Sequence, residues 1–226
     1  SEKAHNLPLL EPRETTSLWE EDLYREHIKR GLDVLLALLI FPLVLPILAL
    51  LLILIKLDSK GPAIFKSERI GKGGRRFAIY KLRTMCLNAE EKLQEILSSD
   101  EALLKEWVTD HKLRNDPRIT RVGRIIRALS LDEIPQIFNV LKGEMSFVGP
   151  RPIVEAEIVK YGKDFRNYTQ MRPGITGLWQ VNGRNDTSYE NRVAFDKKYV
   201  KEVTLAQDLL ILIKTVPVAL SKKGAY

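Results

Sequence analysis

The sequence predicts a mostly helical α+β domain that is embedded in one face of a membrane. Three patterns carry this prediction: an uncharged apolar run over residues 34–55, two short strand patterns around a turn over 61–85, and helical periodicity in much of the remaining chain. We expect a re-entrant membrane helix-break-helix, amphipathic helices in the membrane interface, and a small β-hairpin beside the active site.

Composition limits the chain to one compact unit with an anionic partner. A chain of 226 residues with 45% hydrophobic content can bury one substantial core. The formal net charge of +7 points to nucleic acid, phospholipid headgroups or phosphorylated small molecules, without choosing among them. Cys86 is the single cysteine, which excludes a disulfide within the chain, and the three histidines are too scattered to predict a zinc site.

The first residues are expected to lie outside this unit. Residues 1–18 contain two prolines and few periodic apolar positions, which is typical of a linker or a disordered segment. Residues 19–226 then form a single membrane-associated domain. Its first segment, 19–31, has the pattern of a short amphipathic helix whose Trp19 and Tyr24 can lie at the lipid interface.

The apolar run over 34–55 is long enough to cross a bilayer as a helix. It follows a charged stretch and lacks a cleavage site, so we expect a retained anchor rather than a signal peptide. Lysine and arginine residues flank both ends, which is better explained if both ends stay on the cytoplasmic side. Pro42 and Pro46 near the middle predict a break, and thus a re-entrant segment over about 32–57. An ordinary spanning helix that tolerates its prolines is the alternative.

Three further segments complete the expected domain. Alternating apolar positions over 61–85, interrupted by GKGG, predict two short strands around a turn. Residues 88–113 combine helix formers with apolar residues at helical spacing, which predicts one or two helices. Residues 209–220 are too short to span a membrane and predict a helix in its interface, although a soluble core helix fits the pattern equally well.

Residues 123–152 hold the densest group of chemically informative positions. The adjacent carboxylates of Asp132 and Glu133 precede Pro135, a residue that is favoured at the first position of a helix. The sequence therefore predicts a short helix that starts near Pro135 and ends at Gly143. Both carboxylates would lie at the positive end of this helix.

A purely structural role for these carboxylates is a real alternative. Ser130 and Glu133 match a capping box, in which they would only satisfy free backbone amides. Against this role, Ile134 precedes a proline and should be displaced from helical geometry. A carboxylate near Arg124 and Arg127 should remain ionised and is suited to nucleophilic attack or to holding Mg²⁺.

Positively charged residues in neighbouring loops are candidate ligands of a substrate phosphate. Arginine meets phosphate oxygens in a planar, bidentate manner, and several converging cations would suit a diphosphate. Each residue taken alone is more often a solvated surface group, so only their combination supports the assignment. The candidates are Lys81, Arg83, Arg151, Arg172 and Arg184.

One aromatic position suggests how a nucleotide is recognised. Trp179 can stack on a nucleobase while Gln180 and Asn182 form hydrogen bonds with the edge of the base. A tryptophan packed in the core is the more frequent use of this residue, so both interpretations stay open.

The order of these motifs resembles the bacterial sugar transferase family, the monotopic polyprenyl-phosphate phosphoglycosyltransferases. A hydrophobic segment is followed by KLRTM, SLDEIPQIFNVLKGEMSFVGPRP and RPGITGLWQVNGR, and the resemblance covers residues 25–226. The chain looks like the catalytic portion of the larger members that transfer hexose-1-phosphate and carry further N-terminal membrane helices. The family's re-entrant helix usually has a Ser-Pro pair at its break, whereas this chain has Phe41 and Pro42 there.

The resemblance also implies roles for individual residues. Asp132 and Glu133 would be catalytic, with Asp132 as the nucleophile and Glu133 as a ligand of Mg²⁺, the implied cofactor. Arg127 and Arg151 would contact phosphate.

The implied reaction moves a sugar-1-phosphate, expected to be hexose-1-phosphate, from a UDP-sugar to undecaprenyl phosphate, with release of UMP through a covalent aspartyl-phosphosugar. Its expected setting is the cytoplasmic face of the bacterial inner membrane, as the first membrane step of O-antigen, capsule or exopolysaccharide synthesis. Phospholipid is an expected partner, nucleic acid is not, and a homodimer is left open. A nucleotide-sugar hydrolase and an anionic-lipid-binding protein remain alternatives, and the sequence does not specify the sugar.

Overall fold

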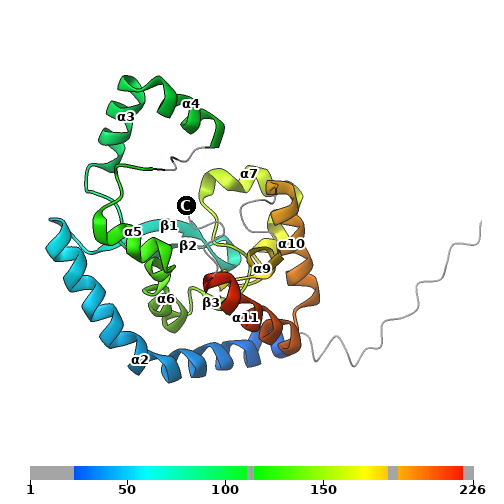
Figure 1. The fold of residues 1–226 in the computed structure, drawn as a ribbon. Coiled ribbons are helices and arrows are strands. Elements are labelled where there is room, and N and C mark those ends of the chain that lie inside the picture. Colours follow the sequence, from blue (N-terminus) through cyan, green and yellow to red (C-terminus); the bar gives the residue numbers. More distant parts are fainter. Residues whose placement is uncertain (1–22, 111–112, 114, 183–187, 221–226) are drawn as a thin grey trace, which may run out of the picture.

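The structure is a computed structural model in which the described residues are 23–110, 113, 115–182 and 188–220 (Figure 1). The expected linker over 1–18 and the residues Trp19 and Arg184 lie outside the described residues. The described part is mostly helical, as the sequence predicts, and has two small sheets, of which the sequence predicts only the hairpin.

One long apolar helix dominates the N-terminal part. The π-helix η1 (Tyr24–Ile28) continues directly into α2 (Lys29–Asp58), which spans 30 residues. Among the described helices, α2 is the one that is long and apolar enough to cross a membrane, and only 17% of its most apolar stretch is buried. An apolar surface of this length is typical of a helix that contacts lipid.

The prolines bend α2 without breaking it. Pro42 and Pro46 both lie inside the helix, and Figure 1 shows α2 curving around the lower side of the domain. The expected helix-break-helix is thus corrected to one bent helix. A proline removes one hydrogen bond and its ring displaces the carbonyl one turn earlier, yet its fixed φ still fits a helix.

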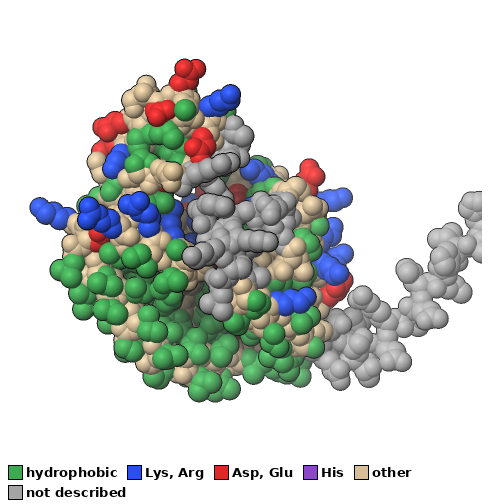
Figure 2. Space-filling model, viewed as in Figure 1, with side chains coloured by type: hydrophobic (Ala, Val, Ile, Leu, Met, Phe, Trp, Pro, Cys, Tyr) green, Lys and Arg blue, Asp and Glu red, His purple; other side chains and the backbone are tan. Residues whose placement is uncertain are grey.

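The exposed apolar surface of α2 continues onto the last helix. The predicted helix over 209–220 is present as α11 (Leu205–Leu220), which begins earlier than expected. Leu209 and Ile213 are exposed on it, whereas Ile211 is buried. Figure 2 shows apolar side chains covering the lower part of the molecule, where α2 and α11 lie in Figure 1. The outward side of α11 therefore suits a membrane interface.

The predicted β-hairpin is confirmed. Strand β1 (Ile64–Ile70) pairs antiparallel with β2 (Arg76–Leu82) across the 3₁₀ turn η2 (Lys72–Gly74). A second sheet pairs β3 (Ser146–Val148) with β4 (Gly174–Thr176) in parallel.

The other helices are short, and the segment over 88–113 holds two of them, within the predicted number. In chain order they are α3 (Ala89–Ser99), α4 (Glu101–Asp110), α5 (Arg121–Ala128), η3 (Leu131–Glu133), α6 (Gln136–Lys142), η4 (Glu155–Glu157), α7 (Ile158–Tyr161), η5 (Gly162–Asp164), α8 (Phe165–Tyr168), α9 (Leu178–Asn182) and α10 (Tyr189–Glu202).

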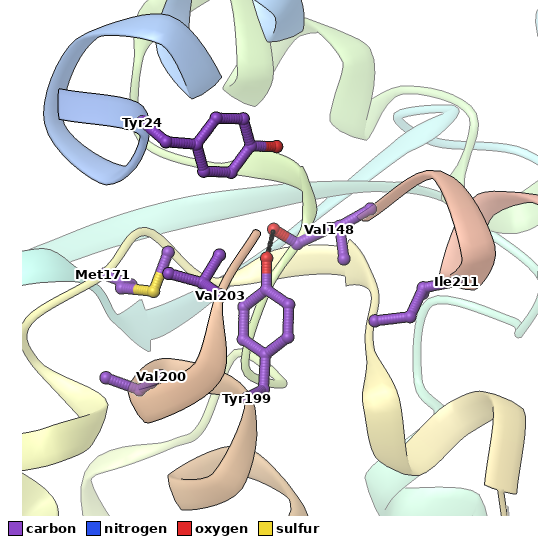
Figure 3. Packing of buried hydrophobic residues seen from close by; sticks show 7 residues of the cluster. All are labelled: Tyr24, Val148, Met171, Tyr199, Val200, Val203 and Ile211. Carbon is purple, nitrogen blue, oxygen red and sulfur yellow. Dashed lines mark hydrogen bonds between the residues drawn. The ribbon is translucent and has the colours of Figure 1, made fainter. Parts of the chain in front are cut away.

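A buried polar network attaches the start of α2 to the core. Lys29 forms an ion pair with Asp208 on α11, and Tyr24 and Tyr199 donate hydrogen bonds of 2.7 and 2.6 Å to the same carboxylate. Figure 3 shows both tyrosines within an apolar cluster, where Tyr199 also donates to the carbonyl of Val148. Tyr24, expected at the lipid interface, is instead buried, because its hydroxyl group has this partner inside the protein.

Both ends of α2 are expected to lie on one side of the membrane, because the helix is bent and its two flanks are basic. Arg25→Cys and Lys66→Cys, each placed in a Cys86→Ser background, test this in sealed vesicles with a membrane-impermeant maleimide. The natural Cys86 of the unaltered chain, in vesicles of phosphatidylcholine alone, gives the reference face. All three positions should be labelled from the same face; labelling of position 25 from the other face would show an ordinary spanning helix.

Candidate active site

The two adjacent carboxylates lie on a short turn that leads into α6. Ser130 has left-handed backbone angles (φ 54°, ψ 31°), which turn the chain between α5 and η3, and η3 contains Asp132 and Glu133. The following helix begins after Pro135 and ends at Gly143, whose φ of 82° suits a glycine, so its predicted bounds hold within one residue.

The capping-box alternative is not what the structure shows. The side chain of Ser130 makes no capping hydrogen bond, and Glu133 is bound to a lysine instead. The expectation for Ile134 was wrong, because this residue is helical (φ −50°, ψ −40°) and its amide donates to Leu131 O at 3.2 Å. A following proline disfavours helical geometry without forbidding it, and here the 3₁₀ turn supplies a hydrogen bond.

Two cations from other elements meet the carboxylates. Lys81 on β2 places its Nζ 2.7 Å from Glu133 Oε1 and 3.5 Å from Asp132 Oδ2. Arg127 on α5 donates from Nε to Thr84 Oγ1 at 2.9 Å, and its charge acts on Asp132. The structure therefore brings together four of the residues that the sequence selected.

The charge state of Asp132 reflects opposing influences. Burial raises the pKa of this carboxyl, and the positive charge of Lys81 opposes the rise. The neighbouring Glu133 raises the pKa of Asp132 further, while Arg127 lowers it, and the resulting pKa is above the ordinary value. The sequence analysis expected this carboxylate to remain ionised, whereas its surroundings in the structure disfavour the ionised form.

A buried amide fixes α6 against the hairpin. Asn139 is fully buried; its Nδ2 donates to Ala78 O at 2.8 Å and to Glu144 Oε2 at 2.7 Å, and its Oδ1 accepts from Tyr80 N at 3.1 Å. These bonds use backbone groups of β2 next to Lys81. Asn139 thereby sets the distance between the lysine and the carboxylates. Sequence reasoning missed this residue, although an amide inside the apolar run IFNVL was a signal for it.

Two predicted phosphate ligands have other partners. Arg83 is buried and donates hydrogen bonds of 2.7 Å to the carbonyls of Ser59 and Lys60, just beyond the end of α2. Arg172 donates from Nε to Gly143 O at 2.8 Å, at the end of α6 opposite to the carboxylate pair. Carbonyls left free at helix ends attract such donors. Neither guanidinium group is directed at the site in this structure.

The residues selected for nucleotide binding lie around α9. Trp179 is buried, and the guanidinium carbons of Arg151 and Arg192 lie 5.6 and 4.8 Å from its ring centroid. This is the packed arrangement that the sequence left as the alternative to base stacking. Asn182 donates to Leu178 O within the helix at 2.8 Å, and Gln180 Oε1 is buried without a hydrogen-bond partner among the described residues. Arg192 was not identified from the sequence.

Comparison with known proteins decides the family. The family described as bacterial sugar transferase matches residues 24–222. The chain belongs to this family. It is 50% identical over 199 residues to the UDP-galactose-lipid carrier transferase of Erwinia amylovora and 49% identical over 199 residues to the undecaprenyl-phosphate galactose phosphotransferase of Salmonella typhimurium. Exopolysaccharide production protein ExoY of Sinorhizobium fredii is 46% identical over 198 residues.

These relatives differ in how much of their length the chain covers. Each match includes 88% of the chain, but only 42% of the Erwinia and Salmonella proteins, so the chain spans less than half of their length. It spans 88% of ExoY.

Replacement of Asn139 tests its role in anchoring α6. Asn139→Ala leaves the partly buried Tyr80 N–H and Ala78 C=O without the partner that Asn139 supplies, so the free energy of unfolding should fall by about 2 kcal/mol. Denaturant unfolding in detergent, followed by circular dichroism, measures this. Asn182→Ala, which removes one exposed hydrogen bond, is the matched control and should change stability by less than about 0.5 kcal/mol. Equal effects of the two replacements would contradict the anchoring role.

Proposed function

We propose that the chain transfers a sugar-1-phosphate from a UDP-sugar to undecaprenyl phosphate and releases UMP. The names of the relatives support this substrate pair. The observation that carries the proposal is that Asp132 lies 3.5 Å from Lys81 Nζ and feels the positive charge of Arg127, in a domain whose helices α2 and α11 expose long apolar surfaces. Such a site can receive a water-soluble donor and a lipid acceptor.

The chemistry follows from a carboxylate nucleophile. The Asp132 carboxylate attacks the sugar-linked phosphorus, and the bond from that phosphorus to the UMP oxygen breaks, so that UMP leaves. An oxygen of undecaprenyl phosphate then attacks the same phosphorus, and Asp132 is released as a carboxylate. Lys81 and Arg127 stabilise negative charge during both steps. Because the two substrates react one after the other, ping-pong kinetics are expected.

The carboxylate pair also suits Mg²⁺. Protein sites for this ion commonly combine one or two carboxylates with substrate phosphates and water. Among the described residues, no group of three or more histidine, cysteine, aspartate or glutamate side chains is placed to hold a metal ion. Glu133, together with the substrate diphosphate, would therefore hold Mg²⁺, which when bound supplies positive charge next to the leaving phosphate.

The proposed setting is the cytoplasmic face of the bacterial inner membrane. The exposed apolar side chains of α2 and α11 would lie in phospholipid, and the bent α2 would enter and leave on the same side. The transferred group is a hexose-1-phosphate in this proposal, because two of the relatives are named for galactose transfer. The product would begin a glycoconjugate such as exopolysaccharide, O-antigen or capsule.

Replacing the nucleophile gives the most direct test. Asp132→Asn should lower UMP release from a UDP-sugar by at least about 10³-fold, both with and without undecaprenyl phosphate, since an amide cannot form the covalent adduct. Mass spectrometry of the unaltered protein mixed with donor alone should show a phosphosugar on the peptide that contains Asp132. Asp100→Asn, on an exposed helix start, is the matched control. Sustained UMP release by Asp132→Asn, or donor cleavage by water with no adduct, would favour a hydrolase.

The pH dependence tests the electrostatic account. The reactive carboxylate is lost as pH falls through the raised pKa of Asp132, so UMP release should decline on the acid side. Lys81 lowers this pKa; Lys81→Met therefore raises it further and should move the acid limb of kcat/KM to higher pH. Lys197→Met, whose partner is Asp164, should leave the limb in place. An unmoved limb in Lys81→Met would contradict the assigned coupling.

A further inference from the structure

A separate cleft lies where the end of α2 meets the start of α5. It has a volume of about 520 Å³ and is lined by side chains of α2, α3, α5 and the segments between them. Four of the lining residues are cations, namely Lys92, Arg118, Arg121 and Arg124. Arg124, expected from the sequence near the carboxylate pair, thus lines this cleft instead.

The cations of the cleft are only partly neutralised by the protein. Arg118 is paired with Asp116 at 2.7 Å, and Lys92 donates to a carbonyl. In the part of the chain that the structure describes, the guanidinium groups of Arg121 and Arg124 have no hydrogen bond or ion pair. The cleft therefore retains positive charge that a ligand can neutralise.

Asp58 is the one carboxylate in the lining of the cleft, and it already accepts a hydrogen bond from the backbone of α5. Asp58 Oδ2 accepts a hydrogen bond of 3.1 Å from Val122 N, and Thr120 Oγ1 accepts one of 3.0 Å from Gly123 N. Together these bonds satisfy amides in the first turn of α5. A ligand of the cleft would meet the arginine side chains rather than the helix end.

Apolar side chains adjoin these cations. Leu57, which lines the cleft, is 79% exposed, and Ile125 on α5 and Leu129 just after it are 62% and 59% exposed. Figure 2 shows lysine and arginine side chains along the upper border of the apolar surface, on the side where α2 ends and α5 lies in Figure 1. Guanidinium groups beside exposed leucine and isoleucine are expected at the depth of lipid headgroups.

We propose that this cleft binds the phosphate of an anionic phospholipid headgroup, with Arg121 and Arg124 as its ligands. Guanidinium groups match phosphate oxygens in geometry and charge, and the acyl chains of the lipid would continue along the exposed leucines of α2. The site is distinct from the carboxylate pair. Because Arg127 lies on the same helix as these two arginines, a bound lipid would also hold α5 in place at the membrane surface.

The single cysteine of the chain provides the measurement, since Cys86 lines this cleft. The full chain in non-ionic detergent is treated with a maleimide, and the rate of Cys86 alkylation is followed by mass spectrometry. Dihexanoyl phosphatidylglycerol at about nine-tenths saturation should slow alkylation about tenfold, because the bound form is shielded. Dihexanoyl phosphatidylcholine and inorganic phosphate, at equal concentration and ionic strength, should change the rate less than about twofold.

Two double variants identify the ligands. Arg121→Ala/Arg124→Ala should lose the protection by phosphatidylglycerol, whereas Arg75→Ala/Arg166→Ala, which removes two exposed arginines elsewhere, should keep it. Arg121→Lys/Arg124→Lys keeps the charge and should restore part of the protection, which separates binding from a folding defect.

Several outcomes would overturn the proposal. These are equal protection by phosphatidylcholine, equal protection by inorganic phosphate, protection that persists in the Arg121→Ala/Arg124→Ala variant, and protection by farnesyl phosphate but not by phosphatidylglycerol. The last outcome would assign the cleft to the lipid acceptor. Since alkylation requires no turnover, none of these results bears on the nucleophile assigned to Asp132.

Discussion

The attachment of α6 is the constraint on which the site depends. A helix of seven residues is too short to be stable by itself, so tertiary bonds must hold it. Asn139, in the middle of α6, supplies two such bonds. Its side-chain amide binds Tyr80 N and Ala78 O at the edge of β2, in the way that a neighbouring strand would. At the far end, Arg30 of α2 donates to the carbonyls of Val140 and Leu141 at 2.5 and 3.0 Å. The turn that carries Asp132 and Glu133 is therefore fixed to both the hairpin and the long apolar helix α2.

The membrane helix is in turn fixed by polar groups, because its apolar surface is mostly turned outward. Lys29 and Asp208 are both buried, and burial of an ion pair costs desolvation energy that their mutual attraction only partly offsets. Tyr24 donates to the same oxygen of Asp208 as Lys29, and Tyr199 donates to the other. Asp33 accepts bonds of 3.0 Å from Ser146 Oγ and Phe147 N. Loss of one partner from such a pair typically costs about 3–5 kcal/mol. These polar bonds thus fix the orientation of α2 relative to the rest of the domain, which non-directional apolar contacts with lipid cannot do.

The sequence predicted the parts of this arrangement that depend on local pattern. Alternating apolar residues and GKGG predicted the hairpin, and the proline and glycine around α6 predicted its bounds, because those signals act within a few residues. The role of Asn139 could not be predicted, since its partners lie about 60 residues earlier in the chain. Likewise, the sequence could not show that Arg83 and Arg172 bind backbone carbonyls rather than phosphate. A guanidinium group can donate to either kind of oxygen.

The electrostatics of the turn bear on the nucleophilic role proposed for Asp132. Two carboxylates and two cations form the local cluster, so its formal charges balance before a substrate arrives. Burial nevertheless leaves the oxygens of Asp132 less well solvated than those of a carboxylate in water. The ionised form of Asp132 is therefore disfavoured. A diphosphate adds negative charge to this balanced cluster, and further positive charge is then required to accept it. In the proposed reaction this charge balance favours entry of a cation together with the donor, and Glu133, which is more exposed than Asp132, is the side chain proposed to bind it.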